Sequence, residues 1–128
     1  MMNSQSRKIL VTGFCLLGLA VLLGAFGAHG LKNLVTPEKL VTFETGVRYH
    51  FYHALGIVLI GLVHQLFPLI KIKISFILFL IGIVLFSFNC YLYVITGLKI
   101  FALIVPIGGT AFLIGWFQLA WQVHRFRN

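Results

Sequence analysis

Residues 74–96 read ISFILFLIGIVLFSFNCYLYVIT, an apolar run without a single charged side chain. An α-helix needs about twenty apolar residues to cross the hydrocarbon core of a bilayer, and this run is long enough. The same composition recurs at residues 9–29, 50–67 and 100–121. With 60% hydrophobic and 9% charged residues, the chain is predicted to be an integral membrane protein with four spans.

These runs predict one antiparallel bundle of transmembrane helices. Backbone groups in lipid must be hydrogen-bonded within a helix or a closed barrel, and the runs lack the alternation of barrel strands. The spans and their connections occupy residues 1–128, which leaves no room for a soluble domain of ordinary size. The first run follows Arg7 and Lys8, as a signal peptide would, but exceeds the roughly 7–15 apolar residues of a signal sequence. We therefore expect an all-α, single-domain protein that retains its first span.

Lysine and arginine residues predict the orientation. The side that holds both termini and the middle connection carries Arg7, Lys8, Lys71, Lys73, Arg125 and Arg127. The opposite side carries Lys32, Lys39, Arg48 and Lys99 together with the acids Glu38 and Glu44. The positive-inside rule then places both termini in the cytoplasm. The few polar residues before Arg7 are unlike a transit peptide, which favours a bacterial plasma membrane over a mitochondrial inner membrane.

The net charge of +8 would suggest a nucleic-acid partner in a soluble domain. Here the basic residues stand singly at span ends, where they meet anionic headgroups on the cytoplasmic side. No basic stripe interleaved with aromatic residues is present, so nucleic-acid binding is not expected. Cys15 and Cys90 lie inside spans without disulfide or metal-ligand spacing, and no cofactor is predicted.

Residues 31–49 form the longest connection, on the outer side, and they predict a helix that begins before the membrane. Thr36 is placed to cap its start, with Pro37 as the first helical residue and Glu38 facing the positive end of the helix dipole. The second span is therefore expected to start as an amphipathic helix. Glu44 and Arg48 are four residues apart and can form an ion pair.

Small residues predict the helix contacts. Ala20, Gly24 and Ala28 recur every four residues in the first span, and Ala111 and Gly115 repeat the spacing in the fourth. Such stripes let two helix backbones approach closely. We interpret both stripes as contact faces, inside one bundle or between protomers.

Polar residues at membrane depth gather in the outer half of the bundle and form a candidate polar cluster. Its members are His29, Glu44, Arg48, Tyr49, His50, His53, Asn89 and Tyr93. At 100° per residue, one face of the second helix holds Gly46, His50, His53, Ile57 and His64, and the opposite face holds Glu44, Arg48, Phe51 and Leu55. Hydrogen bonds to neighbouring helices and headgroups are the favoured role, with Asn89 bonding across helices. A metal would need three or four ligands, and no Cys or carboxylate clearly completes His29, His50 and His53.

Pro106, Gly108 and Gly109 predict a break in the fourth helix. Pro106 removes the bond to the carbonyl of Ala102 and crowds it, so a kink or a short unwound segment is expected. Broken helices bind substrates or ions in transporters, although a kink that only shapes the bundle is the preferred interpretation. Trp116 and Trp121 are assigned to the aromatic belt at the cytoplasmic interface.

Three segments together resemble the domain-of-unknown-function 423 family of small membrane proteins, whose animal relatives are called transmembrane protein 256. They read GAFGAHGL at residues 24–31, FETGVRYH at 43–50 with HAL at 53–55, and PIGGTAFLIGW at 106–116. The resemblance implies a four-span inner-membrane protein without established activity, and it directs attention to His29, His50 and His53. The chain departs from the family at Phe88, where such proteins often have glycine, which puts a close helix contact there in question.

The sequence contains no Ser-His-Asp set, phosphate loop or paired carboxylates within the membrane, so enzymatic hydrolysis is not expected. The favoured function is a non-enzymatic accessory protein that contacts lipids, other membrane proteins or further copies of itself. One alternative is a small oligomeric transporter or channel that uses the outer polar cluster and the broken fourth helix. Another is a metal- or quinone-binding redox role through His29, His50 and His53.

Overall fold

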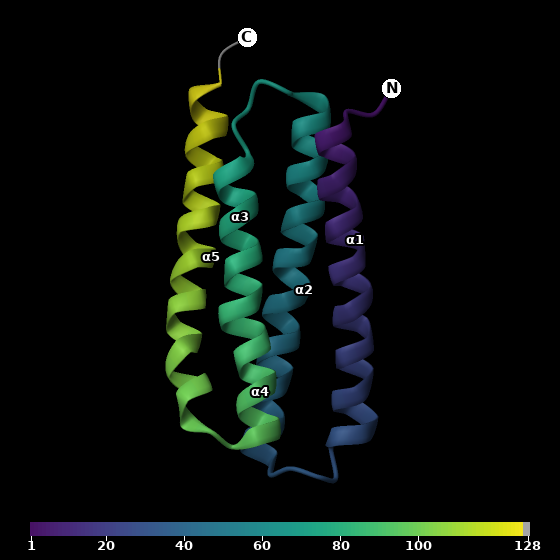
Figure 1. Ribbon diagram of the computed structural model, residues 1–128, viewed down its shortest axis with the longest axis vertical. Helices are drawn as coiled ribbons and strands as arrows, with labels where there is room; N and C mark the ends of the chain where they lie inside the picture. Colours follow the sequence, from purple (N-terminus) through teal and green to yellow (C-terminus); the bar gives the residue numbers. More distant parts are fainter. Residues whose placement is uncertain (127–128) are drawn as a thin grey trace.

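The computed structural model describes residues 1–126, which form four long helices standing side by side (Figure 1). The elements are α1 (Ser4–Ala25), the π-helix η1 (Phe26–Leu31), α2 (Pro37–Leu66), α3 (Lys73–Gly82), the π-helix η2 (Ile83–Phe88), α4 (Asn89–Thr96) and α5 (Lys99–Arg125). α1 runs directly into η1, and α3, η2 and α4 form one continuous helix. Each of the four is long and apolar enough to cross a membrane. Arg127, one of the basic residues that predict the orientation, lies outside the described residues.

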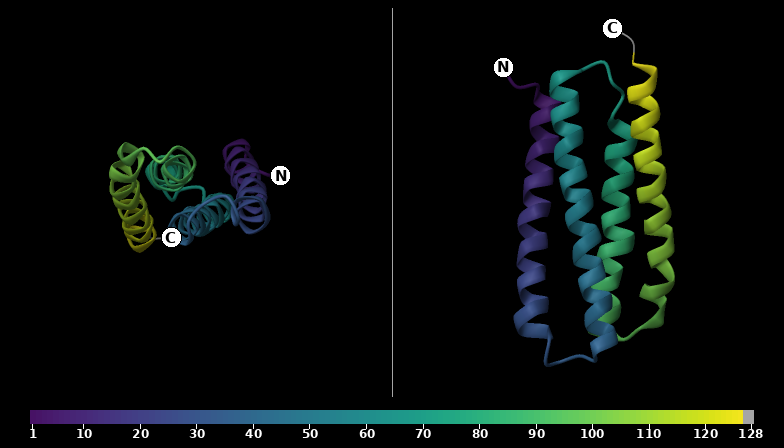
Figure 2. Two further views of the ribbon diagram at one scale, coloured as in Figure 1. Left: turned by 90° about the horizontal axis from the view of Figure 1, so that it is seen from below. Right: turned by 180° about the vertical axis from the view of Figure 1, so that it is seen from behind.

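The helices pack mainly in series. α1 packs on α2, α2 packs on the third helix, and α5 packs on that third helix while also contacting α2 through Trp116 and His53. The view along the bundle shows this zigzag order (Figure 2). The two ends of the chain lie together at what we call the termini end, and residues 32–36 and 97–98 connect helices at the opposite loop end (Figure 1). α2 is therefore a central helix, flanked by α1 and the third helix.

Local sequence signals set the ends of the helices at the loop end. The hydroxyl of Thr36 accepts a hydrogen bond from the backbone N–H of Lys39 at 3.5 Å, and Pro37 opens α2, as predicted. α2 then continues without interruption to Leu66, so residues 37–49 are helical and only residues 32–36 connect it to η1. At the other connection Gly97 adopts φ 73°, a left-handed conformation that favours glycine, and ends α4.

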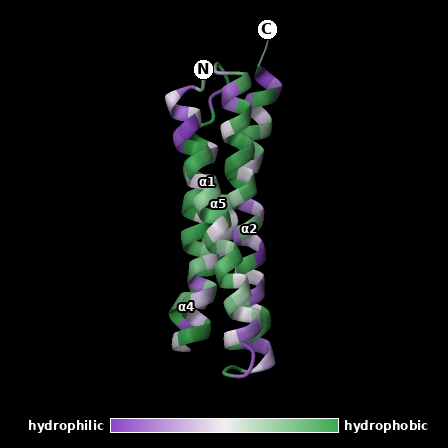
Figure 3. Cartoon of the chain, turned by 90° about the vertical axis from the view of Figure 1, so that its right-hand side faces the viewer, coloured by the Kyte–Doolittle hydropathy of each residue, from purple (hydrophilic) through white to green (hydrophobic). Residues whose placement is uncertain are grey.

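The interior contains two apolar clusters. The larger extends from the termini end to the middle of the bundle and includes Ile57, Phe79 and Phe112. The smaller lies toward the loop end, where Phe43 of α2 packs on Tyr91 of α4. Apolar residues also cover the outside of the helices, and hydrophilic residues gather at both ends and in the lower half of α2 (Figure 3). This distribution is the one that a bilayer-spanning bundle requires.

The face by which α1 packs on α2 differs in part from the predicted stripe. Ala20 is fully buried, but Gly24 is only half-buried and Ala28 is exposed. The buried small residues recur every seven positions instead, at Ser6, Gly13, Ala20 and Gly27. A seven-residue repeat stays on one side of a helix, whereas steps of four residues turn progressively around it. The contact therefore follows the longer repeat along the whole helix.

The fourth helix is not unwound at Pro106. α5 remains helical from Lys99 to Arg125 with Pro106 inside it, which corrects the expected unwound segment. Gly108 instead allows a close backbone contact, since a Cβ there would lie 2.7 Å from the carbonyl carbon of Leu85 and would collide with the backbone nitrogen of Phe86. Ala111 and Gly115 are buried on the same side, as the predicted contact face requires. Helical structure therefore continues through the proline, and the glycine beside it serves close packing against the third helix.

Close contact also persists beside Phe88, the departure from the family pattern. A Cβ at Gly46 of α2 would lie 2.8 Å from Cβ of Cys90 and 3.1 Å from the carbonyl oxygen of Ser87. The side chain of Phe88 meets the ring of His50 edge-on, with centroids 5.6 Å apart. Gly46 on the opposing helix thus supplies the small residue that permits the approach.

Candidate functional site

α2 has one buried and one exposed face, as its 3.6-residue period predicts. His50, His53 and His64 lie on the buried face, together with Gly46 and Ile57. Glu44, Arg48 and Leu55 lie on the exposed face. The histidines and the charged residues of the candidate polar cluster therefore point in different directions.

His53 is held by hydrogen bonds at both ring nitrogens. Its Nδ1–H donates to the carbonyl oxygen of Tyr49 at 2.7 Å, and its Nε2 accepts from the indole N–H of Trp116 at 3.0 Å. The ring of Phe112 stacks on the imidazole with centroids 3.3 Å apart. The two bonds define a neutral imidazole protonated at Nδ1. His53 is thus a fixed junction between α2 and α5.

His50 lies on the other side of the same buried face and joins α2 to α4. Its Nδ1 lies 3.2 Å from the hydroxyl oxygen of Tyr91, and the residue is completely buried. Nearer the termini end, Nδ1 of His64 is hydrogen-bonded to the hydroxyl of Ser6 on α1 at 2.9 Å. One histidine of α2 therefore bonds to α1, one to α4 and one to α5.

The remaining polar residues of the predicted cluster are dispersed. Asn89 donates from Nδ2 to the carbonyl oxygen of Val84 at 3.0 Å, a bond within the third helix rather than across helices, because the π-helix η2 turns that carbonyl toward it. His29 is exposed on η1, and Tyr93 is half-buried beside the smaller apolar cluster. Among residues 1–126, no three His, Cys, Asp or Glu side chains gather closely enough to hold a metal ion.

Trp116 and Tyr91 bond His53 and His50, and the predicted polar cluster includes neither of them. The sequence places Trp116 in the interface belt, whereas its indole is bonded to His53 between α5 and α2 at the wall of the bundle. Its partner is 63 positions away, and only the relative register of α2 and α5 reveals the pair. Trp121 lies nearer the helix end, where the guanidinium of Arg125 lies 4.7 Å from its ring centroid.

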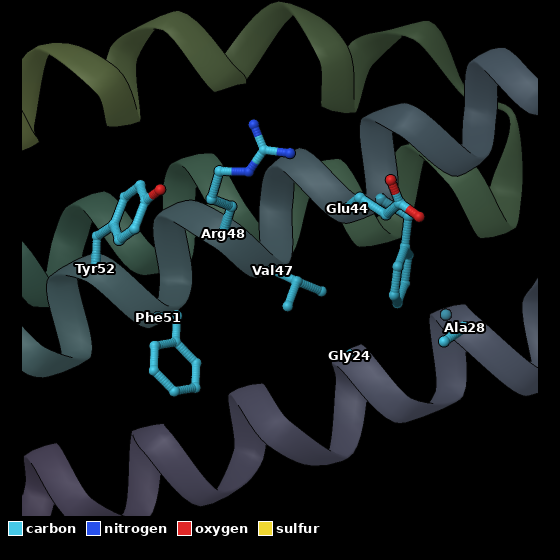
Figure 4. A pocket seen from close by; sticks show the side chains of 9 residues that line it. Gly24, Ala28, Glu44, Val47, Arg48, Phe51 and Tyr52 are labelled. Atoms are coloured by element: carbon cyan, nitrogen blue, oxygen red, sulfur yellow. The ribbon is translucent and has the colours of Figure 1, made fainter.

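A groove runs between α1 and α2 toward the loop end, and we call it the α1–α2 groove. It has a volume of about 380 Å³ and is lined by Gly24, Gly27, Ala28, Phe43, Glu44, Val47, Arg48, Phe51 and Tyr52. Val47 and Phe51 point toward α1, whereas Arg48 and Tyr52 point away from it (Figure 4). The small residues of α1 and η1 leave the space that these α2 side chains border.

A second groove, the α2–α5 groove, lies on the other side of the exposed face of α2. Its volume is about 730 Å³, and its lining consists of Tyr49, Tyr52, His53, Phe86, Pro106, Gly109, Thr110, Phe112, Leu113 and Trp116. Tyr52 borders both grooves. The exposed face of α2 thus forms a ridge, with Arg48 and Tyr52 on it and one groove along each side.

Glu44 and Arg48 do not meet across the helical turn that separates them. In Figure 4 the carboxylate of Glu44 is turned away from Arg48, and the guanidinium of Arg48 does not contact it. The predicted ion pair is therefore absent from this arrangement, and both groups face outward. They are the charged groups of the α1–α2 groove.

The fold defines a small multi-pass α-helical membrane protein. Residues 23–109 match the family described as protein of unknown function (DUF423), and the chain belongs to this family. It is 42% identical over 102 residues to the UPF0382 membrane protein YwdK of Bacillus subtilis, covering 79% of this chain and 83% of that protein. It is 35% identical over 121 residues to a UPF0382 membrane protein of Haemophilus influenzae, covering 94% of each. No solved structure matches the chain.

Proposed function

We propose that this protein is a non-enzymatic accessory protein of the bacterial plasma membrane that acts through contacts with lipids and other membrane proteins. The observation that carries the proposal is the division of polar groups on α2. His50, His53 and His64 are engaged in bonds that tie helices together. Glu44 and Arg48 face outward beside the α1–α2 groove. The groups available to a partner therefore lie on the outer surface of the bundle.

The proposal includes an orientation, with both termini in the cytoplasm. Arg7, Lys8, Lys71 and Lys73 belong to the termini end, where they favour anionic headgroups of the inner leaflet. The loop end, with Glu38 and Glu44, then faces the outside. The relatives in Bacillus subtilis and Haemophilus influenzae are named membrane proteins, which supports a bacterial membrane.

Native mass spectrometry of the protein, extracted gently from its own membrane, tests this function. We expect a recurring lipid or a second membrane protein to remain bound. A monomer or homo-oligomer that carries neither would contradict the proposal. Dilution of the extract with empty detergent micelles provides the control, because adventitious lipid is lost in proportion to dilution whereas a specific partner is retained.

A further inference from the structure

We propose that the ridge of α2 and its two grooves bind one zwitterionic phospholipid with a primary ammonium head group, of the phosphoethanolamine type. Arg48 binds the phosphate, Glu44 binds the ammonium, and each groove takes one acyl chain. This inference rests on the proposed function and names a ligand for it.

The position of Arg48 along α2 fits the boundary between hydrocarbon and headgroups. α2 has 30 residues and is about 45 Å long at 1.5 Å per residue, so it exceeds the hydrocarbon core of about 30 Å. A span of about twenty residues counted back from Leu66 ends near Val47. Exposed residues on the termini side of this point are apolar, such as Leu55, Leu59 and Leu62. Arg48 therefore lies at the depth of lipid phosphates, and Glu44 lies one turn further out.

The charges on the ridge complement such a head group. A guanidinium offers paired N–H donors to phosphate oxygens, which favours bidentate binding. In phosphoethanolamine a two-carbon link separates the phosphate from the ammonium, and a rise of about 6 Å along the helix separates the four positions from Glu44 to Arg48. Because the carboxylate of Glu44 is turned away from Arg48, the two groups do not contact each other, and each can meet the opposite charge of the lipid. A carboxylate can accept N–H bonds from a primary ammonium but not from a quaternary one.

The grooves on either side of the ridge suit two acyl chains. The α1–α2 groove is walled by Gly24, Gly27, Val47 and Phe51. The α2–α5 groove is walled by rings that include Phe86 and Phe112. Tyr52 borders both grooves. The α1–α2 groove lies beside the two charged groups and reaches Phe51 and Tyr52, whereas the α2–α5 groove begins at Tyr49 and continues toward the termini end. A helix of a second copy would need one continuous groove, whereas a glycerophospholipid has two chains joined at one head group.

Lipid retention by the purified, delipidated full chain tests the inference. The protein is mixed with equal amounts of ethanolamine, choline and glycerol phospholipids that have identical acyl chains, and bound lipid is measured by native mass spectrometry. We expect retention of the ethanolamine lipid to exceed that of each of the others about threefold or more. Arg48→Gln should lower retention of every phospholipid about threefold to tenfold. Glu44→Gln should remove the preference for ethanolamine over choline while leaving total retention within about twofold.

Matched controls remove other charges at the loop end. Lys32→Gln and Glu38→Gln alter exposed residues that do not line either groove, so the lipid profile should stay unchanged. Helical circular dichroism confirms that each variant is folded. Equal retention of the three lipids by the unaltered chain, unchanged retention by R48Q, or an unchanged preference in E44Q would each overturn the inference.

The outcome also separates this inference from the proposed function. A second protein retained from the native membrane, without any headgroup preference in the lipid mixture, overturns the lipid site and leaves the accessory function standing. A dimer that excludes lipid and is dissociated by Arg48→Gln assigns the ridge to a second copy and overturns the lipid site as well. Loss of every partner in both experiments overturns both proposals.

Discussion

The indole N–H of Trp116 donates to Nε2 of His53 across 3.0 Å, and this bond joins α5 to α2. The opposite ring nitrogen of His53 donates to the carbonyl oxygen of Tyr49, so the histidine has no free nitrogen left. The ring of Phe112 stacks on one side of the imidazole. The arrangement fixes the position of α5 relative to α2, and with it the width of the α2–α5 groove.

Replacing Trp116 tests the strength of this junction. Trp116→Phe keeps an aromatic ring but removes the donor, which leaves Nε2 of a nearly buried histidine without its partner. Interhelical hydrogen bonds in membranes contribute about 0.6 kcal/mol on average and up to about 1.7 kcal/mol, so we expect a loss of unfolding free energy in that range. The measurement is equilibrium unfolding of the purified protein in mixed micelles. Trp121→Phe is the control. Trp121 is 49% exposed against 39% for Trp116, and its ring contacts Arg125 of its own helix, so a loss as large as that of Trp116→Phe would count against the junction.

The outline of the fold follows from local patterns, which is why it can be predicted. Long apolar runs specify spans, Thr36 and Pro37 mark a helix start, and the 3.6-residue period separates His50 from Arg48 on α2. These signals depend on neighbouring residues alone. They do not depend on which helices meet.

The features that escaped prediction depend on how two helices are aligned. The partner of His53 lies 63 residues away, and nothing near either residue identifies the pair. The π-helices η1 and η2 each shift the register of a span, and no proline marks either one. Glu44 and Arg48 have the spacing of an ion pair, yet the carboxylate of Glu44 is turned away from Arg48. The candidate site is therefore visible in the sequence only as a set of polar residues.

The seven-residue repeat of small residues on α1 predicts which glycines of that helix tolerate alanine. A Cβ at Gly13 would lie 2.7 Å from Cγ2 of Val58 and 3.1 Å from its backbone nitrogen, whereas a Cβ at Gly18 would meet nothing within 4 Å. We expect Gly13→Ala to cost about 1–3 kcal/mol of unfolding free energy, because α1 must move away from α2. Gly18→Ala should be neutral or stabilising by up to about 1 kcal/mol. Unfolding in mixed micelles measures both, and equal effects would show that α1 does not pack through this repeat.

The two neighbouring glycines after Pro106 offer a matched pair on α5. Gly108→Ala would place a methyl group against the backbone of Leu85 and Phe86, which cannot move aside as a side chain can. At Gly109 the nearest atom is a ring carbon of Phe86 at 3.6 Å, an ordinary contact. We expect Gly108→Ala to destabilise the protein by about 1–3 kcal/mol and Gly109→Ala to leave its thermal unfolding midpoint nearly unchanged. If both positions tolerate alanine equally, the glycines serve flexibility near Pro106 rather than close packing.

Single cysteines test the proposed orientation of the helices. With Cys15 and Cys90 replaced by alanine, Leu34→Cys introduces a thiol at a position that is 76% exposed in the connection at residues 32–36. Met2→Cys introduces one at the termini end, where the side chain is 56% exposed. A thiol in water ionises and reacts with maleimide, whereas one in lipid does not. A membrane-impermeant maleimide added to intact cells should therefore label L34C but reach M2C only after the membrane is opened. The reverse pattern would place the termini outside and move Glu44 and Arg48 to the cytoplasmic leaflet, where the ridge would face a different population of lipids.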